Sequence, residues 1–394
     1  MIAGWQTKTL GDVCEVINGG TPKTGVPAYW DGEHRWITPA EMGKRLSPYV
    51  GETERMITDL GLRNSSAQML PLGSVILSSR APIGHLVINT EPMATNQGCK
   101  GLIPNDKLQT KFLYYYLSSI GDLLNSLGTG ATFKELSGGK LKEVPIPIPS
   151  LADQGRIVNV LDEAIAGIAI AKANSEKNLQ QAQAIFASRL ETIFALRGPN
   201  WAAKRLDEVG KTQTGSTPKT SDQSNYGHFV PFVKPGDFHP DGALDYDNDG
   251  LSESGARGAR IVPAGSVLMV CIGATIGKCG YSDQDVATNQ QVNALTPTDG
   301  SCHRFLYYQM RTEKFQRSVI HASGQATLPI INKSKWSALP VWLPPQAEEQ
   351  KVIAAELDEL AIETNRLAGI YARKLAVLNA LKQSLLHHAF SGKL

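Results

Sequence analysis

The stretch Val144-Pro-Ile-Pro-Ile-Pro149 is followed directly by a long helical pattern, and together they decide how this chain is organised. Prolines at alternate positions cannot continue a helix, so they mark the place where one begins. Over residues 151–196, apolar or small side chains recur in alternating steps of three and four, a heptad pattern of about five repeats. This pattern predicts one long helix of the coiled-coil type. Its predicted seam includes Ile157, Leu161, Ile168, Leu179 and Phe186.

The same arrangement returns near the end of the chain. Another proline-punctuated stretch, Leu339-Pro-Val-Trp-Leu-Pro344, precedes a second heptad pattern. We therefore expect two matching coiled-coil helices in one chain. The predicted seam of the second helix includes Ile353, Leu357, Leu367, Leu378 and Leu385.

The two halves of the chain also match outside the helices. Trp5 returns as Trp201, an offset of 196 residues (201 − 5 = 196), and small insertions shift the later pairs only slightly. So long a period indicates a tandem duplication of a whole module rather than a solenoid. The matching segments are residues 19–24 with 215–220, 73–77 with 265–269, 94–97 with 287–290, and 112–115 with 305–308.

The length of 394 residues predicts two or three domains, each able to bury a core of its own. In each globular part, short strands separated by turns, many Gly and Pro residues and a short helix predict an irregular α+β domain with long loops. Loops on a rigid scaffold are where recognition usually occurs. The expected boundaries are 1–148 and 198–343 for the globular parts, and 149–197 and 344–394 for the helical parts.

Composition sets limits on the partners and on the location of the chain. The net charge of +2 favours no partner, so a DNA-binding surface would have to come from local placement of Lys and Arg. The five cysteines are odd in number and show no Cys-x-x-Cys spacing, which indicates reduced thiols rather than disulfides or a zinc site. The N-terminus has neither a basic start nor an apolar run, so we expect a cytoplasmic protein without a membrane span.

The motifs that carry chemistry are incomplete. The segment Ile272-Gly-Ala-Thr-Ile-Gly-Lys278 has too few residues between its glycines for a phosphate-binding loop, and Cys279 stands where Ser or Thr is needed. Pro240-Asp241 lacks a nearby acidic residue with a lysine two places on, which a nuclease centre would need. No Asn-Pro-Pro-Tyr/Phe motif that would hold a flipped base occurs, and His387-His388 lacks partners at metal spacing. We therefore expect a non-catalytic chain without a metal or cofactor of its own.

The order of the motifs points to a known family. Each globular part begins with Trp-x-x-Lys-x-Leu, continues with Gly-Gly/Ser-Thr-Pro-Lys-Thr and is followed by a long helix. In these features, and in its ending Leu386-His-His-Ala-Phe-Ser-Gly-Lys-Leu394, the chain resembles the DNA specificity subunit of a Type I restriction-modification system. The resemblance implies two target recognition domains, each reading one half of a split, asymmetric DNA sequence. It also implies that the two helices pack as an antiparallel spacer.

The resemblance further implies several partners. Two methyltransferase subunits would dock on the helices and bring S-adenosylmethionine, and restriction subunits that use ATP and Mg would join the assembly on double-stranded DNA. The chain itself would perform no chemistry, which agrees with the incomplete motifs. A helix of about 45 residues spans roughly 65 Å, whereas major grooves on one face of DNA recur about every 34 to 36 Å. Helices of this length could therefore set the gap between the two half-sites.

Candidate DNA contacts fall in loops that recur in both halves. A Lys beside hydroxyl groups suits phosphate contact, although an exposed turn lysine gives the same pattern. An Asn-Gln pair can bind adenine edges, although a structural turn after an apolar strand also explains it. Residues 130–132 and 325–327 mark a further pair of loops that could approach the DNA backbone. The candidate residues are Thr21, Lys23, Thr24, Arg80, Asn96, Gln97, Thr217, Lys219, Thr220, Lys278, Asn289 and Gln290.

Two other functions are compatible with parts of this pattern. A coiled-coil scaffold whose globular ends bind proteins would show no salt-dependent affinity for DNA. A detached portion of a single-chain enzyme would carry its catalytic domains before this region, and Trp5 so close to the start leads us to expect no such domain.

Overall fold

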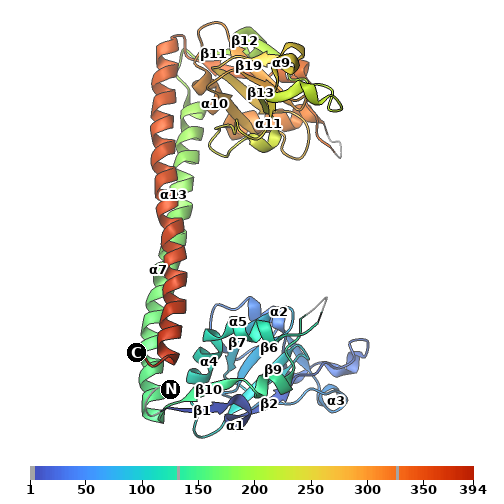
Figure 1. The fold of residues 1–394 in the computed structure, drawn as a ribbon, viewed down its shortest axis with the longest axis vertical. Helices are drawn as coiled ribbons and strands as arrows, with labels where there is room; N and C mark the ends of the chain where they lie inside the picture. Colours follow the sequence, from blue (N-terminus) through green and yellow to red (C-terminus); the bar gives the residue numbers. More distant parts are fainter. Residues whose placement is uncertain (1–4, 131–133, 325–327) are drawn as a thin grey trace. The chain divides into compact units, whose positions relative to one another are not determined.

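The computed structural model describes residues 5–130, 134–324 and 328–394 (Figure 1). The chain forms two compact units, the first made of residues 1–175 with 374–394 and the second of residues 176–373. Each unit combines one globular part with portions of the two long helices, α7 (Leu151–Leu196) and α13 (Ala347–Phe390). The prediction of two tandem α+β parts with two long helices is confirmed.

The first globular part is built on three small sheets. Its strands are β1 Gln6–Thr9, β2 Cys14–Asn18, β3 Trp30–Ile37, β4 Tyr49–Val50, β5 Arg55–Ile57, β6 Val75–Ser79, β7 Ile83–Asn89, β8 Ala94–Thr95, β9 Cys99–Pro104 and β10 Pro145–Ile148. The sheets have the orders β2-β9-β6-β7-β4, β5-β3-β8 and β1-β10. The helical segments are α1 Leu10–Val13, η1 Pro27–Tyr29, α2 Pro39–Gly43, α3 Asp59–Arg63, α4 Thr110–Ser119, α5 Gly121–Leu127 and α6 Gly138–Lys142.

The second globular part repeats this plan, but its two larger sheets differ from those of the first part in their edge strands. Its strands are β11 Ala202–Arg205, β12 Gly210–Thr214, β13 Tyr226–Val233, β14 Gly250–Leu251, β15 Ile261–Val262, β16 Ser266–Val270, β17 Cys279–Ser282, β18 Val286–Thr288, β19 Val292–Pro297 and β20 Pro340–Leu343. The sheets have the orders β12-β19-β16-β17, β14-β13-β18-β15 and β11-β20. The helical segments are α8 Leu206–Val209, η2 Gln223–Asn225, η3 Pro235–Asp237, α9 Glu253–Gly258, α10 His303–Arg311, α11 Glu313–Ser323 and α12 Lys333–Ser337.

The proline-punctuated stretch before the first long helix forms strand β10. Among the strands of the described residues it pairs with β1 alone, in the antiparallel sense, placing Pro145 opposite Thr9 and Pro147 opposite Thr7. A proline has no N–H to donate, so it is tolerated in such an edge pair and not in a central strand. The strand pair holds the start of the globular part against its end, directly before α7.

A buried glutamine anchors the start of each long helix to the globular part before it. In the first unit, Gln154 accepts a hydrogen bond from the Gln109 backbone N–H (2.8 Å) and donates to the Lys107 carbonyl (2.9 Å). In the second unit, the buried Gln350 accepts from the Cys302 backbone N–H at 2.9 Å. A buried amide that is satisfied in this way favours one orientation of the helix.

About two helical turns further on, a carboxylate in each helix binds the globular part. Asp162 accepts from the Tyr115 hydroxyl and from Lys111 Nζ, both at 2.6 Å. Asp358 accepts from Tyr308 and Arg304 in the equivalent positions. Burial, together with donation to these carboxylates, raises the pKa of both tyrosine hydroxyls, so they stay protonated donors.

Each globular part also packs against the end of the other long helix. In the first unit, Phe390 of α13 lies edge-on to Phe112, with ring centroids 5.1 Å apart. In the second unit, Phe194 of α7 lies 5.1 Å from the ring of Phe305. Within each unit the two helices therefore run antiparallel (Figure 1). Among the predicted seam residues, Ile157, Leu161, Ile168 and Leu357 are buried, while Leu179, Phe186, Ile353, Leu367, Leu378 and Leu385 are half-buried.

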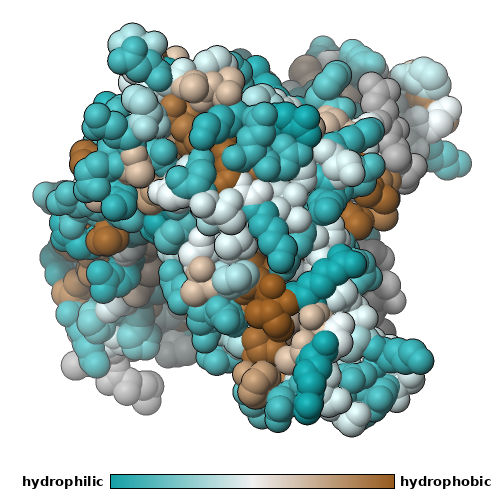
Figure 2. All heavy atoms as spheres, turned by 90° about the horizontal axis from the view of Figure 1, so that it is seen from above, coloured by the Kyte–Doolittle hydropathy of each residue, from teal (hydrophilic) through white to brown (hydrophobic). Residues whose placement is uncertain are grey.

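Figure 2 shows a face on which hydrophilic side chains dominate and apolar ones form only small patches. Within the described ranges, no helix combines the length and apolar character needed to cross a membrane.

We predict that Asp162→Ala destabilises the first unit by about 1–3 kcal/mol, because the Tyr115 hydroxyl and the Lys111 ammonium lose a charged acceptor. The measurement is the free energy of unfolding of the full chain in denaturant. Glu163→Ala is the matched control, since Glu163 is the exposed neighbour on the same helix and should change stability by less than about 0.5 kcal/mol. Equal effects of the two changes would contradict the anchoring role of Asp162.

Candidate nucleic-acid interface

Two of the predicted loops meet in the first unit. The Gly20 backbone N–H donates to the Thr95 carbonyl at 2.9 Å, which holds the loop of residues 19–24 against the turn after β8. The Asn96 side chain then donates to the Thr21 hydroxyl at 3.0 Å. Five of the candidate residues, Thr21, Lys23, Thr24, Asn96 and Gln97, are thereby brought into two adjoining loops.

The same two loops meet in the second unit through a different side chain. The Ser216 backbone N–H donates to the Thr288 carbonyl at 2.8 Å. Here the Thr217 hydroxyl donates to Gln290. The connection between the loops is thus present in both units, but the Asn of the pair makes it in the first unit and the Gln makes it in the second.

A glycine allows the close approach in both units. A Cβ added at Gly19 would lie 2.0 Å from the Asn96 carbonyl oxygen, and one at Gly215 would lie 2.2 Å from the Thr288 hydroxyl. No side chain can be accommodated at such distances without moving the loop. The glycines that open each repeated motif are therefore required by packing between the loops.

The candidate cations of these loops are exposed to solvent. Lys23 and Lys219 are both exposed, as are the adjacent Thr24 and Thr220. Within the part of the chain that the structure describes, neither lysine forms an ion pair. An exposed ammonium beside hydroxyl groups is suited to a phosphate oxygen. Contact of these residues with DNA remains a prediction.

The Asn-Gln pairs divide into locally bonded and exposed members. Asn96 accepts from the Gly98 backbone N–H at 2.8 Å, and the buried Asn289 accepts from the Gln291 backbone N–H at 3.1 Å. Both asparagines thus close the turn after the strand. Gln97 and Gln290 are exposed, and their amide groups are the better placed of the four to meet a base edge.

Arg80 and Lys278, which lie at nearly equivalent positions beside the Ile-Gly turns, occupy different environments. Arg80 lies 3.9 Å from Glu135, which is also 4.0 Å from Lys100. Lys278 instead donates to the carbonyl of Phe238 at 3.3 Å and to that of Pro235 at 3.4 Å. These carbonyls hold its ammonium against the loop after β13, so the two cations are not presented in the same way.

Lys100 was not among the residues predicted from the sequence. It lies on β9 with only 5% of its surface exposed, and this burial lowers its pKa. Its equivalent in the second unit is the buried Asn293, which accepts from the Thr214 hydroxyl at 2.7 Å. One sequence signal could have identified Lys100, namely that it is a charged residue inside an apolar strand pattern, directly after the Asn-Gln turn.

Aromatic side chains support the loop of residues 19–24. The indole N–H of Trp30 donates to the Lys23 carbonyl at 3.2 Å, and that of Trp36 donates to the Gly20 carbonyl at 2.9 Å. In the second unit, the Tyr226 hydroxyl donates to the Pro218 carbonyl at 3.2 Å. Strands β3 and β13 thus hold the equivalent lysine loops in place.

Residues 131–132 and 325–327 of the further predicted loops lie outside the described residues.

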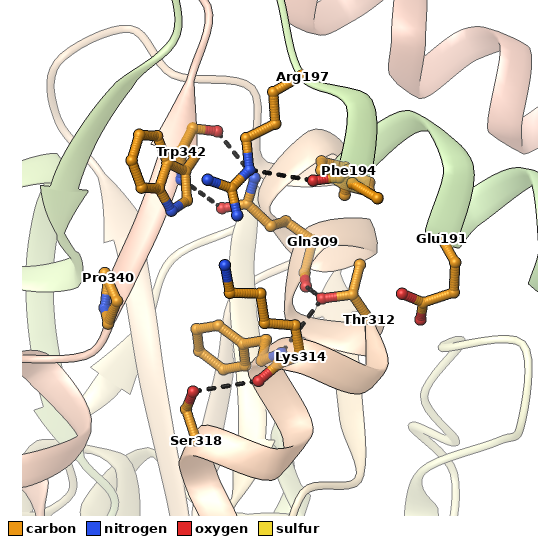
Figure 3. Close-up of a pocket in the computed structure, with 11 residues that line it drawn as sticks. Glu191, Phe194, Arg197, Gln309, Thr312, Lys314, Ser318, Pro340 and Trp342 are labelled. Atoms are coloured by element: carbon orange, nitrogen blue, oxygen red, sulfur yellow. Dashed lines mark hydrogen bonds between the residues drawn. The ribbon is translucent and has the colours of Figure 1, made fainter.

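The second unit contains a partly open pocket of about 90 Å³ between the end of α7, α10, α11 and β20 (Figure 3). Arg197 lies over the ring of Trp342 at 4.0 Å from its centroid and donates to the Phe194 carbonyl at 3.1 Å. Gln309 bonds to both the N–H and the carbonyl of Trp342, at 2.6 and 2.8 Å. Both polar side chains therefore bond to backbone groups of the pocket wall, as is usual for polar groups at the edge of a core.

In the described ranges, one group of side chains has the spacing of metal ligands, namely Glu33, His34 and Asp59. His34 Nε2 lies 2.7 Å from Asp59 Oδ1, and hydrogen bonding to His34 lowers the pKa of Asp59. Arg63 lies near the other carboxylate oxygen, at 3.7 Å. The carboxylate thus already has two partners of its own within the protein.

The chain matches a known family over most of its length. Residues 2–181 and 199–371 each match the family described as the Type I restriction modification DNA specificity domain. The chain therefore belongs to this family, and the expectation of a DNA specificity subunit with two recognition domains is confirmed.

Known specificity subunits match this chain over its whole length or over part of it. The Type I restriction enzyme MjaIX specificity subunit of Methanocaldococcus jannaschii is 27% identical over 418 residues, covering 99% of this chain and 93% of that protein. The EcoR124I/EcoR124II specificity subunit of Escherichia coli is 32% identical over 163 residues, covering 40% of each.

Solved structures support the fold. A chain from a study of complex assembly and conformational transition in the type I R-M system has a TM-score of 0.78 at 21% identity, covering 100% of this chain and 99% of that one. The HsdS subunit from Thermoanaerobacter tengcongensis has a TM-score of 0.61 at 19% identity, covering 100% and 98%.

We predict that Gly19→Ala displaces the lysine loop and weakens recognition of one half-site. The added methyl group overlaps the Asn96 carbonyl, and such overpacking costs about 1–3 kcal/mol. Gly25→Ala is the matched control, because a Cβ at Gly25 meets nothing within 4 Å. The measurement is the affinity for duplex DNA containing the target, together with the melting temperature. A Gly25→Ala variant as impaired as Gly19→Ala would contradict this account.

Proposed function

We propose that this chain reads a split, asymmetric DNA sequence, with one recognition domain on each half. The observation that carries the proposal is the repeated pair of loops, 19–24 with 94–97 and 215–220 with 287–290, joined by the same backbone bonds in both units. The scaffold is the same, whereas the exposed side chains around it differ. Two frames of one design with different surfaces suit two different half-sites.

Local charges rather than net charge would provide affinity for DNA. The chain carries a net charge of only +2, so its long-range attraction to DNA is small. Lys23 and Lys219 offer exposed ammonium groups in equivalent loops. Neutralising phosphates in this way makes binding depend on salt. A protein-binding scaffold would lack that dependence.

We further propose that methyltransferase and restriction subunits dock on this chain. Several apolar side chains on the long helices are exposed, among them Ile170 at 64%, Ile362 at 66% and Val377 at 65%. Apolar side chains repeated along a helix favour burial against another protein. S-adenosylmethionine, ATP and Mg would be bound by those partners, and this chain would contribute recognition without catalysis, in the cytoplasm.

The test is base-resolution methylation of genomic DNA from cells carrying a matched methyltransferase subunit, with and without this chain. We expect an asymmetric split motif of methylated adenines only when the chain is present. Replacing residues 1–148 by the equivalent part of a relative should change one half of the motif and leave the other unchanged. Co-purification of the two proteins without any motif would instead favour the scaffold.

A second prediction concerns the helices. Inserting one heptad into α7 and one into α13 keeps both seams in phase and adds about 10 Å of helix. We expect the gap between half-sites to grow by about three base pairs, with both half-sites unchanged in the methylation motif. Replacing seven exposed helix residues without changing the length is the control. Altered bases in either half-site would contradict a spacer role.

A further inference from the structure

We infer that Arg55 reads a guanine in the first half-site, an inference that rests on the proposed function. Arg55 lies on β5 and is exposed, and its guanidinium carbon lies 3.7 Å from the centroid of the Trp30 ring. Beneath it, Trp30 and Trp36 pack edge to face with centroids 5.1 Å apart, and both rings are buried. The arginine therefore stacks on a fixed aromatic platform.

This platform is joined to the candidate DNA-binding loop. Trp30 and Trp36 donate their indole N–H groups to the carbonyls of Lys23 and Gly20, as described above. Arg55 consequently lies beside the exposed Lys23, separated from its backbone by one tryptophan ring. A phosphate contact by Lys23 would bring the DNA to the same side of the domain as Arg55.

The state of the guanidinium suits base reading. Within the described residues, no carboxylate lies within 4.0 Å of the Arg55 guanidinium, and the guanidinium N–H groups donate no hydrogen bond to the protein. Stacking fixes the plane of the guanidinium and leaves the N–H groups at its edge free to donate. Two parallel donors from one arginine match the O6 and N7 acceptors of guanine in the major groove.

The second recognition domain has the opposite charge at the same position. Arg55 pairs with Trp36 across the β3–β5 ribbon, and Trp36 in turn pairs with Ala94 of β8. In the second unit, the Phe232 N–H donates to the Asp249 carbonyl at 2.8 Å, and Phe232 pairs with Ala287 of β18. Asp249 therefore corresponds to Arg55.

The opposite charges of Arg55 and Asp249 favour a contact with a base over a contact with a phosphate. The Asp249 carboxylate is bound by Lys234 Nζ at 2.7 Å, so this position is an acceptor where the first domain has a donor. Phosphates are present in every sequence, and a position used to bind them would keep a positive charge in both domains. A position that discriminates between bases is free to change from donor to acceptor.

The test uses the full chain with its matched methyltransferase subunits and duplexes randomised at each base of the target. We expect Arg55→Gln to lose discrimination at one guanine of the first half-site by about 5- to 150-fold. Arg55→Lys should lose it similarly while keeping the salt dependence of binding, because lysine retains the charge without the planar fork. The second half-site should be read as before.

Arg63→Gln is the control, since Arg63 is an exposed arginine of the same domain; it should leave the motif unchanged. Uniform weakening on all sequences by Arg55→Gln, with a shallower salt slope, would identify a phosphate contact and overturn the inference. An unchanged motif would overturn it as well. Failure of the unaltered chain to give any motif would instead sink the proposed function, and the role of Arg55 with it. Equal melting temperatures of the Gln and Lys variants and the unaltered chain exclude misfolding as the cause.

Discussion

The structure depends on the hydrogen bond between a helix carboxylate and a tyrosine hydroxyl of the adjoining globular part. Asp162 and Asp358 each accept from a tyrosine and a cation, about two turns after a buried glutamine has fixed the start of the helix. A long helix pair alone would allow the globular part many orientations. Fixed polar contacts at defined turns limit those orientations, because leaving any one of these groups unpaired is costly. Loops placed on such a frame can hold a constant geometry.

The two units separate what is fixed from what varies. The close approach at Gly19 and Gly215 and the backbone bonds between the loops are the same in both. The side chains that join those loops differ, since Asn96 acts in one unit and Gln290 in the other. Backbone contacts thus preserve the shape of the interface while permitting exchange of the exposed residues. A duplicated module can in this way acquire two different specificities without losing its fold.

Much of the architecture could be predicted from the sequence, because duplication and heptad spacing are local patterns repeated at a constant offset. The meeting of the lysine and Asn-Gln loops could not, since it depends on pairing between residues about 75 apart. The contact of the Lys278 ammonium with the carbonyl oxygens of Pro235 and Phe238 could not be predicted either, because those residues are about 40 positions away in the sequence. The stacking of Arg55 on Trp30 was missed because an irregular register in β3 separates residues that pair with the same strand. A shift of strand register of this kind cannot be predicted from the amino-acid sequence pattern alone.

A chain of nearly neutral charge can still recognise DNA if its few donors are held rigidly. With a net charge of +2, attraction to phosphate over long distances contributes little to affinity. Specificity then rests on groups whose orientation is fixed before binding, so that little conformational entropy is lost on contact. The exposed Lys23 and the stacked Arg55 both lie in the first unit, the former on a loop bound to the sheets and the latter on strand β5. Partner subunits that bind the same DNA would add affinity without needing to alter the sequence that is read.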